Sequence, residues 1–476
     1  MDRAALREVR DLPRPPGLPI IGNLHQIDTE RMHVTAEQWR RKYGDFFRFR
    51  NGPRELVVVA DPEAIAAMLR DRPDGFHRTH RLSSIASEMG FDGVFTANGD
   101  EWRRQRPMVM AGLDPAHIKS YFPALVRVTE RFRKRWQRAA AAGESINLQA
   151  DLMRYTVDVT AGLAFGADIN TIESDEDVIQ RHLDKILPAL FRRLMAPFKY
   201  WRLLRLPYDR KLDRHLVELR HAVNQFITSA RARMDAEPAR RAEPTNLIEA
   251  MIAARDTEGS GVDDGDVAGN VLTMLLAGED TTANTLAWMI YLLGRNPQAL
   301  ERAKAEVRGV LGAAALPGLY EQLGKLPFVE ACTHETMRLR PVAPIIILEA
   351  GRDSVVAGIR IPRGQLVMCL MRPPAVDEKH FQDPQSFDPG RWLESGTRGA
   401  SSAKRVAMPF GAGPRLCPGR YLAMLEMKMV MAMLLSGFEI ESVGAGSNGG
   451  EPKEHLAFTM YPEGLKLKLR KSGSGT

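Results

Sequence analysis

One long apolar helix constrains the fold of this chain more than any other feature of its sequence. Asp263-Asp264-Gly265-Asp266 supplies the acidic residues that favour a helix start, and Asn296-Pro297 stops the helix after about Arg295. At a rise of about 1.5 Å per residue, a helix of this length crosses an entire domain. Other elements must pack around it, and the remaining patterns predict a mainly α protein with a small β-rich portion.

The domain organisation follows from what the 476 residues lack. We find no linker and no internal repeat, so we expect a single domain over 1–476. Residues 1–12 are interpreted as a short charged leader and 471–476 as a disordered tail. There is no signal peptide and no apolar run of about 18 residues, so we expect a cytoplasmic protein without a transmembrane anchor. We expect no nucleic-acid partner.

The middle of the long helix departs from good helix-forming sequence. Ala277-Gly278-Glu279-Asp280-Thr281-Thr282 contains a glycine, which costs about 1 kcal/mol inside a helix, and two adjacent threonines. One explanation is packing, with Thr281 bonded back to a carbonyl one turn earlier. The other is that an acid and an alcohol are needed at this place for chemistry.

A glycine- and proline-rich loop, Phe410–Gly419, surrounds a single cysteine, Cys417. Gly413 and Gly419 can take positive φ and let the backbone pass close to a flat ligand. The helix start that follows and the guanidinium of Arg415 would favour a thiolate at Cys417. The three cysteines of the chain have no spacing typical of zinc sites, disulfides or iron–sulfur clusters. Cys417 is therefore either a structural cysteine or a lone ligand of another kind.

These two segments together resemble the cytochrome P450 family. The loop matches Phe-x-x-Gly-x-Arg-x-Cys-x-Gly, and the helix matches Ala/Gly-Gly-x-Asp/Glu-Thr. The resemblance implies haem b (heme, iron protoporphyrin IX) held between the long helix and the helix after the loop. It assigns Cys417 as the iron ligand, Asp280 as a proton relay and Thr281 as a hydrogen-bond partner of dioxygen or its water. The cofactor-binding residues of the loop are Phe410, Gly413, Arg415 and Gly419.

Two further motifs carry the resemblance. Trp102 and Arg106 lie four apart on one helix face, and the family holds a haem propionate with such a pair. Relatives often add an Arg or His where this chain has Leu348, so we expect Trp102, Arg106 and Arg415 to hold the propionates alone. Glu335-x-x-Arg338 and the later Arg391 are expected to form a buried structural network, with the arginine of Phe387-Asp388-Pro389-Gly390-Arg391-Trp392 closing it.

The basic excess of the chain is local. The segment Phe191–His215 has eight cations and two aspartates, and the whole chain has a net charge of only +7. In the family this region covers the substrate entrance. Attraction of an acidic substrate, contact with an anionic membrane surface and a merely solvated face all remain open.

The resemblance implies a haem-thiolate monooxygenase that inserts one oxygen atom of dioxygen into an organic substrate. The segments Ile345–Ile347 and Leu456–Met460, with Phe458, suggest an apolar pocket, and the basic segment weakly suggests a carboxylate on the substrate. We find no flavin or ferredoxin module, so NAD(P)H electrons would arrive through a ferredoxin or flavodoxin and its reductase. Docking cations for that partner are Arg103, Arg104, Arg420 and Lys428.

Two alternatives compete with this interpretation. A haem-thiolate peroxygenase or isomerase needs no external electrons, but such proteins commonly lack the acid–threonine pair that Asp280 and Thr281 form. A catalytically silent haem-binding protein is the other alternative.

Overall fold

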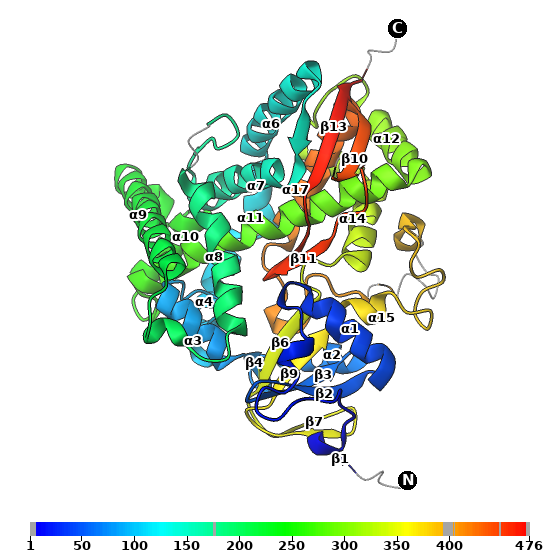
Figure 1. Ribbon diagram of the computed structural model, residues 1–476. Coiled ribbons are helices and arrows are strands. Elements are labelled where there is room, and N and C mark those ends of the chain that lie inside the picture. Colours follow the sequence, from blue (N-terminus) through cyan, green and yellow to red (C-terminus); the bar gives the residue numbers. More distant parts are fainter. Residues whose placement is uncertain (1–5, 175–177, 394–402, 404, 447–448, 473–476) are drawn as a thin grey trace.

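The structure is a computed structural model that describes residues 6–174, 178–393, 403, 405–446 and 449–472. Helix α11 (Asp264–Arg295) runs through the middle of the molecule, with helices and small sheets around it (Figure 1). Its N-cap is Asp263, whose side chain accepts a hydrogen bond from the Asp266 N–H at 2.7 Å. The predicted central helix is confirmed at both ends.

The helices make up most of the described chain, which confirms the mainly α fold class. Their bounds are α1 Met32–Tyr43, α2 Pro62–Arg70, α3 His80–Met89, α4 Gly99–Gly112, α5 Pro115–Ser120, α6 Phe122–Ala142, α7 Leu148–Phe165, α8 Val178–Met195, α9 Pro207–Ala236, α10 Leu247–Asp256, α12 Pro297–Leu311, α13 Tyr320–Gly324, α14 Pro327–Leu339, α15 Arg372–Ala375 and α17 Arg420–Gly437.

The β-rich portion contains one five-stranded sheet and three smaller pairings. The large sheet has the order β2 (Phe46–Asn51), β3 (Arg54–Val59), β9 (Leu366–Leu370), β6 (Ile345–Ala350) and β4 (Phe76–Arg78). The others are β1 (Arg7–Glu8) with β8 (Ile359–Ile361) and β7 (Ser354–Val356), β10 (Phe438–Ala445) with β13 (Leu465–Lys471) and β5 (Ser145–Asn147), and the hairpin β11 (Glu454–Ala457) with β12 (Thr459–Pro462).

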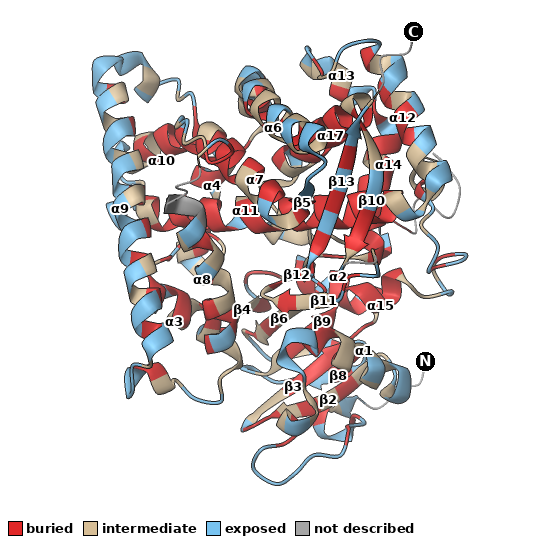
Figure 2. Cartoon of the chain, turned by 45° about the horizontal axis from the view of Figure 1, so that its top comes forward, coloured by how far each residue is buried: buried red, intermediate tan, exposed pale blue. Residues whose placement is uncertain are grey.

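Burial follows this arrangement. In Figure 2, α11 and α17 are largely buried, whereas the outer face of α9 is exposed. A continuous apolar core includes the side chains of Trp136, Phe132 and Trp288, which are almost fully buried. Inside the predicted leader, Arg7 and Glu8 pair with β8, and Leu12 is buried in a second core. Within the predicted tail, Lys471 ends β13, and residues 473–476 lie outside the described residues.

Candidate active site

A cavity of about 470 Å³ lies between the centre of α11, the Cys417 loop, the start of β6 and the tip of the β11–β12 hairpin. Of the residues predicted for the site, Trp102, Arg106, Thr281, Phe410, Arg415, Cys417 and Gly419 line it. Gly413 and Asp280 lie outside its lining. The rest of the wall is largely apolar and includes Phe95, Phe191, Ile345, Ile347 and Phe458.

The hairpin tip that faces the cavity is strained. Phe458 has φ +91°, a conformation that side chains other than glycine rarely adopt. Its ring packs edge-on against Phe95, with the ring centroids 5.9 Å apart. The prediction that Leu456–Met460 reaches the pocket is confirmed, since Phe458 and Thr459 both line it. Such strain is typical of residues held in place beside a binding site.

The Cys417 loop is shaped by two of its glycines. Gly411 and Gly413 have positive φ, and a Cβ on Gly413 would lie 2.5 Å from the Leu69 carbonyl oxygen. The loop therefore packs directly on the end of α2. The Cys417 N–H donates to the Phe410 carbonyl oxygen at 3.0 Å, which closes the loop around the sulfur.

Three expectations about the sulfur need correction. Gly419, the N-cap of α17, has φ −82° rather than positive φ. Burial raises the pKa of the Cys417 thiol, while a hydrogen bond from the Gly419 N–H and the charges of Arg106 and Arg420 lower it. The expected cation, Arg415, is not among these groups. The helix starts at Arg420, so Pro418 lies in the turn before it and provides no N–H to the sulfur.

Arg415 belongs instead to a buried cluster of three arginines. Its guanidinium carbon lies 5.1 Å from the centroid of the Trp102 ring, and Nη2 donates to the Ala97 carbonyl oxygen. Burial lowers the pKa of Arg415 to about 9, and the charges of Arg72 and Arg106 add to this. Burial lowers the pKa of Arg72 to about 10. The pKa of Arg78 is well below its usual range because of burial first and then the charges of Arg72 and Arg415.

This cluster fits the two carboxylates of a haem. Among the described residues, Nε and Nη2 of Arg72 and Nε of Arg415 are buried without a hydrogen-bond partner. Like charges that converge in a buried place are unfavourable unless an anion neutralises them. Arg72, Arg78 and Arg415 all line the cavity. An anionic group on the ligand at this edge would satisfy both the charges and the free N–H groups.

The sequence interpretation missed Arg72 and Arg78. Leu348, the position where relatives often carry a cation, is fully buried in the sheet. Arg78 is its direct partner across the β4–β6 ladder, so the neighbouring strand provides the guanidinium. Trp102, Arg106 and Arg415 were expected to hold the propionates alone. The cavity wall has two further cations, Arg72 and Arg78, so that expectation was incomplete. Arg106 donates to the Leu416 carbonyl oxygen at 2.5 Å and lies closer to the sulfur side.

At the centre of α11, Thr281 faces the cavity and its hydroxyl donates to the Ala277 carbonyl oxygen at 2.9 Å. The bond to the preceding turn that the packing explanation requires is therefore present. Gly278 has a packing reason of its own, because a Cβ there would lie 2.3 Å from Thr160 Oγ1 on α7. Thr281 thus combines a local bond with access to the cavity.

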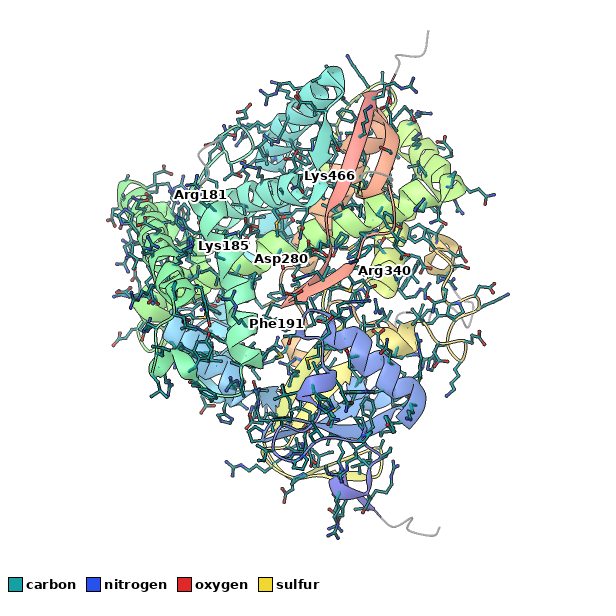
Figure 3. All side chains as sticks on the ribbon, viewed as in Figure 1. Arg181, Lys185, Phe191, Asp280, Arg340 and Lys466 are labelled. Carbon is teal, nitrogen blue, oxygen red and sulfur yellow. The ribbon has the colours of Figure 1, made fainter. Side chains whose placement is uncertain are left out.

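Asp280 lies on another face of α11, which contacts α8 and the β11–β12 hairpin (Figure 3). Its carboxylate accepts hydrogen bonds from Asn284 Nδ2 at 2.7 Å and from the Thr459 hydroxyl. Asn284 Oδ1 in turn accepts from Gln149 Nε2 at 2.8 Å. Burial raises the pKa of Asp280 to about 6, although the bonds from Thr459 and Asn284 oppose the shift. A carboxyl with this pKa can both release and accept a proton near neutral pH.

Glu426 is a second acid that the sequence interpretation missed. It lies on α17, lines the cavity and is almost completely buried. Burial raises its pKa well above the usual range, and a hydrogen bond from Thr282 opposes this. Only its place nearly two turns into the apolar helix after the Cys417 loop could have drawn attention to it.

The predicted structural network is confirmed. Both carboxylate oxygens of Glu335 accept from Arg338, at 2.7 and 2.8 Å, and Oε1 also accepts from Arg391 Nε at 3.0 Å. The Trp392 indole N–H donates to Glu335 Oε2 at 2.8 Å. The guanidinium of Arg338 also donates hydrogen bonds to the carbonyl oxygens of Ala375, Pro384 and Ser386.

Four of the eight cations of the basic segment Phe191–His215 form ion pairs within the molecule. Lys199 and Arg202 pair with Glu88, Arg205 pairs with Asp213, and the buried Arg193 pairs with Asp209. From this segment, only Phe191, Leu194 and Met195 line the cavity, and none of its eight cations does. The end of α8 is fixed by cations from elsewhere, since Arg54 and Arg81 donate to the carbonyl oxygens of Leu194 and Ala196.

Comparisons with known proteins agree with this geometry. Residues 12–469 match the sequence model of the family described as Cytochrome P450. The chain is 27% identical over 440 residues to the cyclooctat-9-en-7-ol 5-monooxygenase of Streptomyces melanosporofaciens, covering 90% of this chain and 89% of that protein. It is 28% identical over 463 residues to the cyclooctatin synthase of the same organism, covering 96% and 95%.

Another relative is a self-sufficient cytochrome P450 monooxygenase of Oidiodendron maius, 27% identical over 436 residues, of which this chain covers 39%. Among the described helices, none is long and apolar enough to cross a membrane. The family match over nearly the whole chain and the cysteine loop at the cavity wall lead to one conclusion: this chain belongs to the cytochrome P450 family and is an oxidoreductase that incorporates oxygen.

Proposed function

We propose that this protein is a haem-thiolate monooxygenase that inserts one oxygen atom of dioxygen into an apolar organic substrate. The observation that carries the proposal is that Cys417 and Thr281, from two distant parts of the chain, line one largely apolar cavity. When bound there, haem b supplies the iron at which dioxygen is activated. The mainly aliphatic and aromatic wall would hold a substrate and exclude bulk water from the reaction.

The chain offers a complete set of groups for the cofactor. Cys417 would bind the iron, and Phe410, Gly413 and Gly419 would shape the loop around it. Arg72, Arg78 and Arg415 would hold the propionates, because their guanidinium groups converge at one wall, where Arg72 and Arg415 keep unpaired N–H donors. Trp102 stacks on Arg415 and keeps its guanidinium in place. Arg106, closer to the sulfur, would support the loop through its bond to the Leu416 carbonyl oxygen.

Proton delivery is assigned to Thr281 and Asp280. The Thr281 hydroxyl lies at the cavity wall and can turn from the Ala277 carbonyl oxygen toward the cavity. Asp280 would hold the proton on its carboxyl, between Asn284 and Thr459. Thr459 both touches this carboxyl and lines the cavity, so its hydroxyl is a bridge between Asp280 and the cavity.

Electrons are proposed to come from NAD(P)H through a separate ferredoxin or flavodoxin and its reductase. Of the four cations predicted for docking, Arg103, Arg104 and Lys428 pair with carboxylates of this chain. Arg420 has no carboxylate partner among the described residues and donates to the Tyr421 hydroxyl at 2.9 Å. Its charge is therefore available to an acidic donor on the Cys417 side. The buried free thiols of Cys332 and Cys369 support a reducing, cytoplasmic location.

The substrate is proposed to be apolar. The name of the Streptomyces relative describes oxidation of an unsaturated alcohol, which is consistent with a mainly apolar molecule. A carboxylate on the substrate has little support from the basic segment, because its cations are ion-paired or lie away from the cavity. The solvated-face explanation is the one we favour for that segment. A spectral binding screen with fatty acids, terpenoids and aromatic compounds would identify the class.

The decisive experiment compares electron sources with a substrate found by that screen. Dioxygen, NAD(P)H and a generic ferredoxin and reductase should yield oxygenated product, with the new oxygen derived from isotopically labelled dioxygen. Product with peroxide alone, and none with the reductase system, would indicate a peroxygenase. No product under either condition, despite bound haem, would indicate a catalytically silent haem protein.

A further inference from the structure

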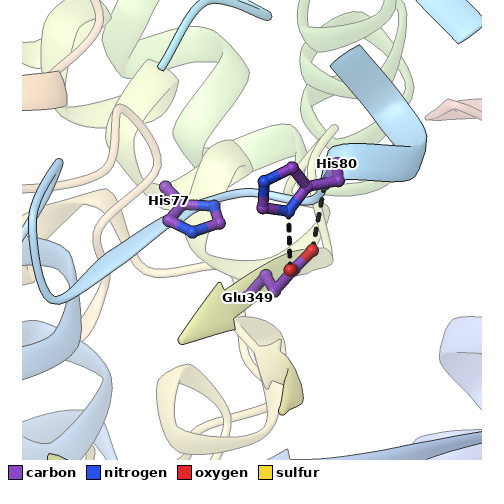
Figure 4. Close-up of side chains that lie close together, drawn as sticks. All are labelled: His77, His80 and Glu349. Atoms are coloured by element: carbon purple, nitrogen blue, oxygen red, sulfur yellow. Dashed lines mark hydrogen bonds and ion pairs between the residues drawn. The ribbon is translucent and has the colours of Figure 1, made fainter. Parts of the chain in front are cut away.

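A cluster of two histidines and one glutamate lies at the edge of the large sheet, outside the set of groups assigned to haem. His77 belongs to β4, His80 is the first residue of α3, and Glu349 belongs to β6 (Figure 4). One potential metal-binding atom from each residue lies within 4.8 Å of the others. His77 and Glu349 are direct partners in the antiparallel ladder, so the backbone itself brings them together.

The protonation of His77 is set by its surroundings. Its Nδ1 lies 2.8 Å from the carbonyl oxygen of Arg78. Because a carbonyl oxygen can only accept, Nδ1 carries the hydrogen, and in the neutral tautomer this leaves the lone pair on Nε2. Histidines that bind metals commonly donate their other ring N–H to a carbonyl or carboxylate in this way. The ring is also held by packing, since a Cβ on Gly351 would lie 3.1 Å from its Cδ2.

Glu349 is oriented by two donors from His80. Its Oε1 lies 2.6 Å from His80 Nδ1, and its Oε2 accepts from the His80 backbone N–H at 3.0 Å. The dashed lines in Figure 4 mark both contacts. The His80 side chain is 77% exposed, whereas that of Glu349 is 15% exposed. An ion can therefore reach the group from solvent while the carboxylate stays in place.

We propose that His77, His80 and Glu349 bind a divalent transition-metal ion of the Zn²⁺ kind. Two imidazoles and one carboxylate are a ligand set that suits Zn²⁺, with water completing a tetrahedral site, and they disfavour Mg²⁺ and Ca²⁺, which prefer oxygen ligands. The rings are 5.0 Å apart by their centroids, and the His80 side chain is largely exposed, so modest side-chain movement brings the donor atoms to metal distance. The ion would connect β4, β6 and the start of α3.

This connection matters for the cavity. Arg78 lies between the two histidines in the chain, and both Arg78 and Glu349 line the cavity. A bound ion would hold the backbone on both sides of Arg78 and so stabilise the wall that carries its guanidinium. The site is separate from the proposed iron ligand, Cys417.

The test uses the haem-loaded protein after treatment with EDTA and dialysis. Isothermal titration with ZnCl₂ and metal analysis after gel filtration should give about one zinc per chain for the wild type. His80→Ala and Glu349→Gln should each weaken binding at least tenfold, and zinc should raise the unfolding temperature of the wild type but not of His80→Ala. His117→Ala is the matched control. His117 also pairs with a carboxylate, that of Asp114, but among the described residues this pair belongs to no group of three possible metal ligands.

Equal zinc binding by wild type and His80→Ala, or no zinc retained by the wild type, would overturn the proposal. The haem content and absorption spectrum of His80→Ala should match the wild type, since His80 does not line the cavity. This readout separates failure of the metal site from failure of the proposed monooxygenase function.

Discussion

Thr459, at the tip of the β11–β12 hairpin, donates a hydrogen bond to the carboxylate of Asp280 in the middle of α11. Asp280 thereby faces away from the cavity lining while Thr459 belongs to it. The acid of the helix motif is thus connected to the cavity through a residue from the end of the chain. A buried carboxyl joined to the cavity by a hydroxyl suits a group that stores a proton and passes it on.

Asp280→Asn should slow turnover by about 10²–10⁴-fold, the usual contribution of a general acid or base, while leaving haem content unchanged. Because the pKa of Asp280 is about 6, its acid form is lost as pH rises through 6. Wild-type turnover should therefore fall above that pH, and the variant should lack this limb of the profile. Steady-state rates between pH 5 and pH 8 at a saturating donor concentration would measure it, and an identical limb in both proteins would exclude Asp280.

The same pKa predicts a stability effect with a definite sign. The folded protein binds a proton on Asp280 more tightly than the unfolded chain does. Protonated Asp280 therefore contributes fully to the free energy of unfolding below the unfolded pKa, and this contribution is lost as pH rises through about 6. Asparagine does not ionise, so Asp280→Asn should not show this fall in the free energy of unfolding. The variant should gain stability relative to wild type between acidic and neutral pH in chemical unfolding curves.

Thr281→Ala should retain haem and substrate binding but divert electrons to peroxide and water. The hydroxyl is the polar group that α11 presents to the cavity at this point, so its loss removes a hydrogen bond at the reaction site. Product formed per NAD(P)H consumed should fall, and Thr281→Ser should restore most of it. An unchanged product yield in Thr281→Ala would assign the residue to packing alone.

Arg72→Met should weaken haem retention by about ten- to a hundredfold, the range expected for a lost hydrogen bond to a charged group. In the haem-free protein the same change should not destabilise the fold, because it removes a like charge from beside Arg78 and Arg415. Haem transfer to apomyoglobin and urea unfolding of the haem-free protein give the two readouts. Arg352→Met, which removes an exposed arginine paired with Asp71, is the control and should change neither.

Glu335→Gln should lower the free energy of unfolding by about 3–5 kcal/mol, because it leaves the buried guanidinium of Arg338 without its counter-charge. Glu330→Gln on the same helix is the matched control. The Glu330 side chain is 44% exposed, so loss of its pair with Lys428 should cost clearly less than loss of the fully buried Glu335–Arg338 pair. Equal losses in the two variants would contradict the structural role of the Glu335 network.

Local sequence signals predicted much of this fold. The bounds of α11 follow from the Asp263 cap and Asn296-Pro297. The Glu335 network was predicted from the family resemblance, because its motifs are contiguous in the chain.

What the sequence left undetermined depends on contacts between distant segments. Arg78 faces the cavity because β4 pairs with β6, and Arg72 reaches the same wall from the turn after α2; no local pattern encodes either placement. The bond between Asp280 and Thr459 has the same origin. Arg415 was expected both near the sulfur, from its nearness in the chain, and at the propionates; its side chain contacts Trp102 and the Ala97 carbonyl oxygen.

The central claim is that Cys417 binds haem iron as a thiolate. The absorption spectrum of the reduced protein under carbon monoxide tests it most directly, because a thiolate ligand shifts the Soret band strongly to the red compared with a histidine ligand. We predict the red-shifted band for the wild type and its loss in Cys417→His, with haem still bound. A wild-type band at the position typical of histidine ligation, or a red-shifted band that persists in Cys417→His, would contradict the account.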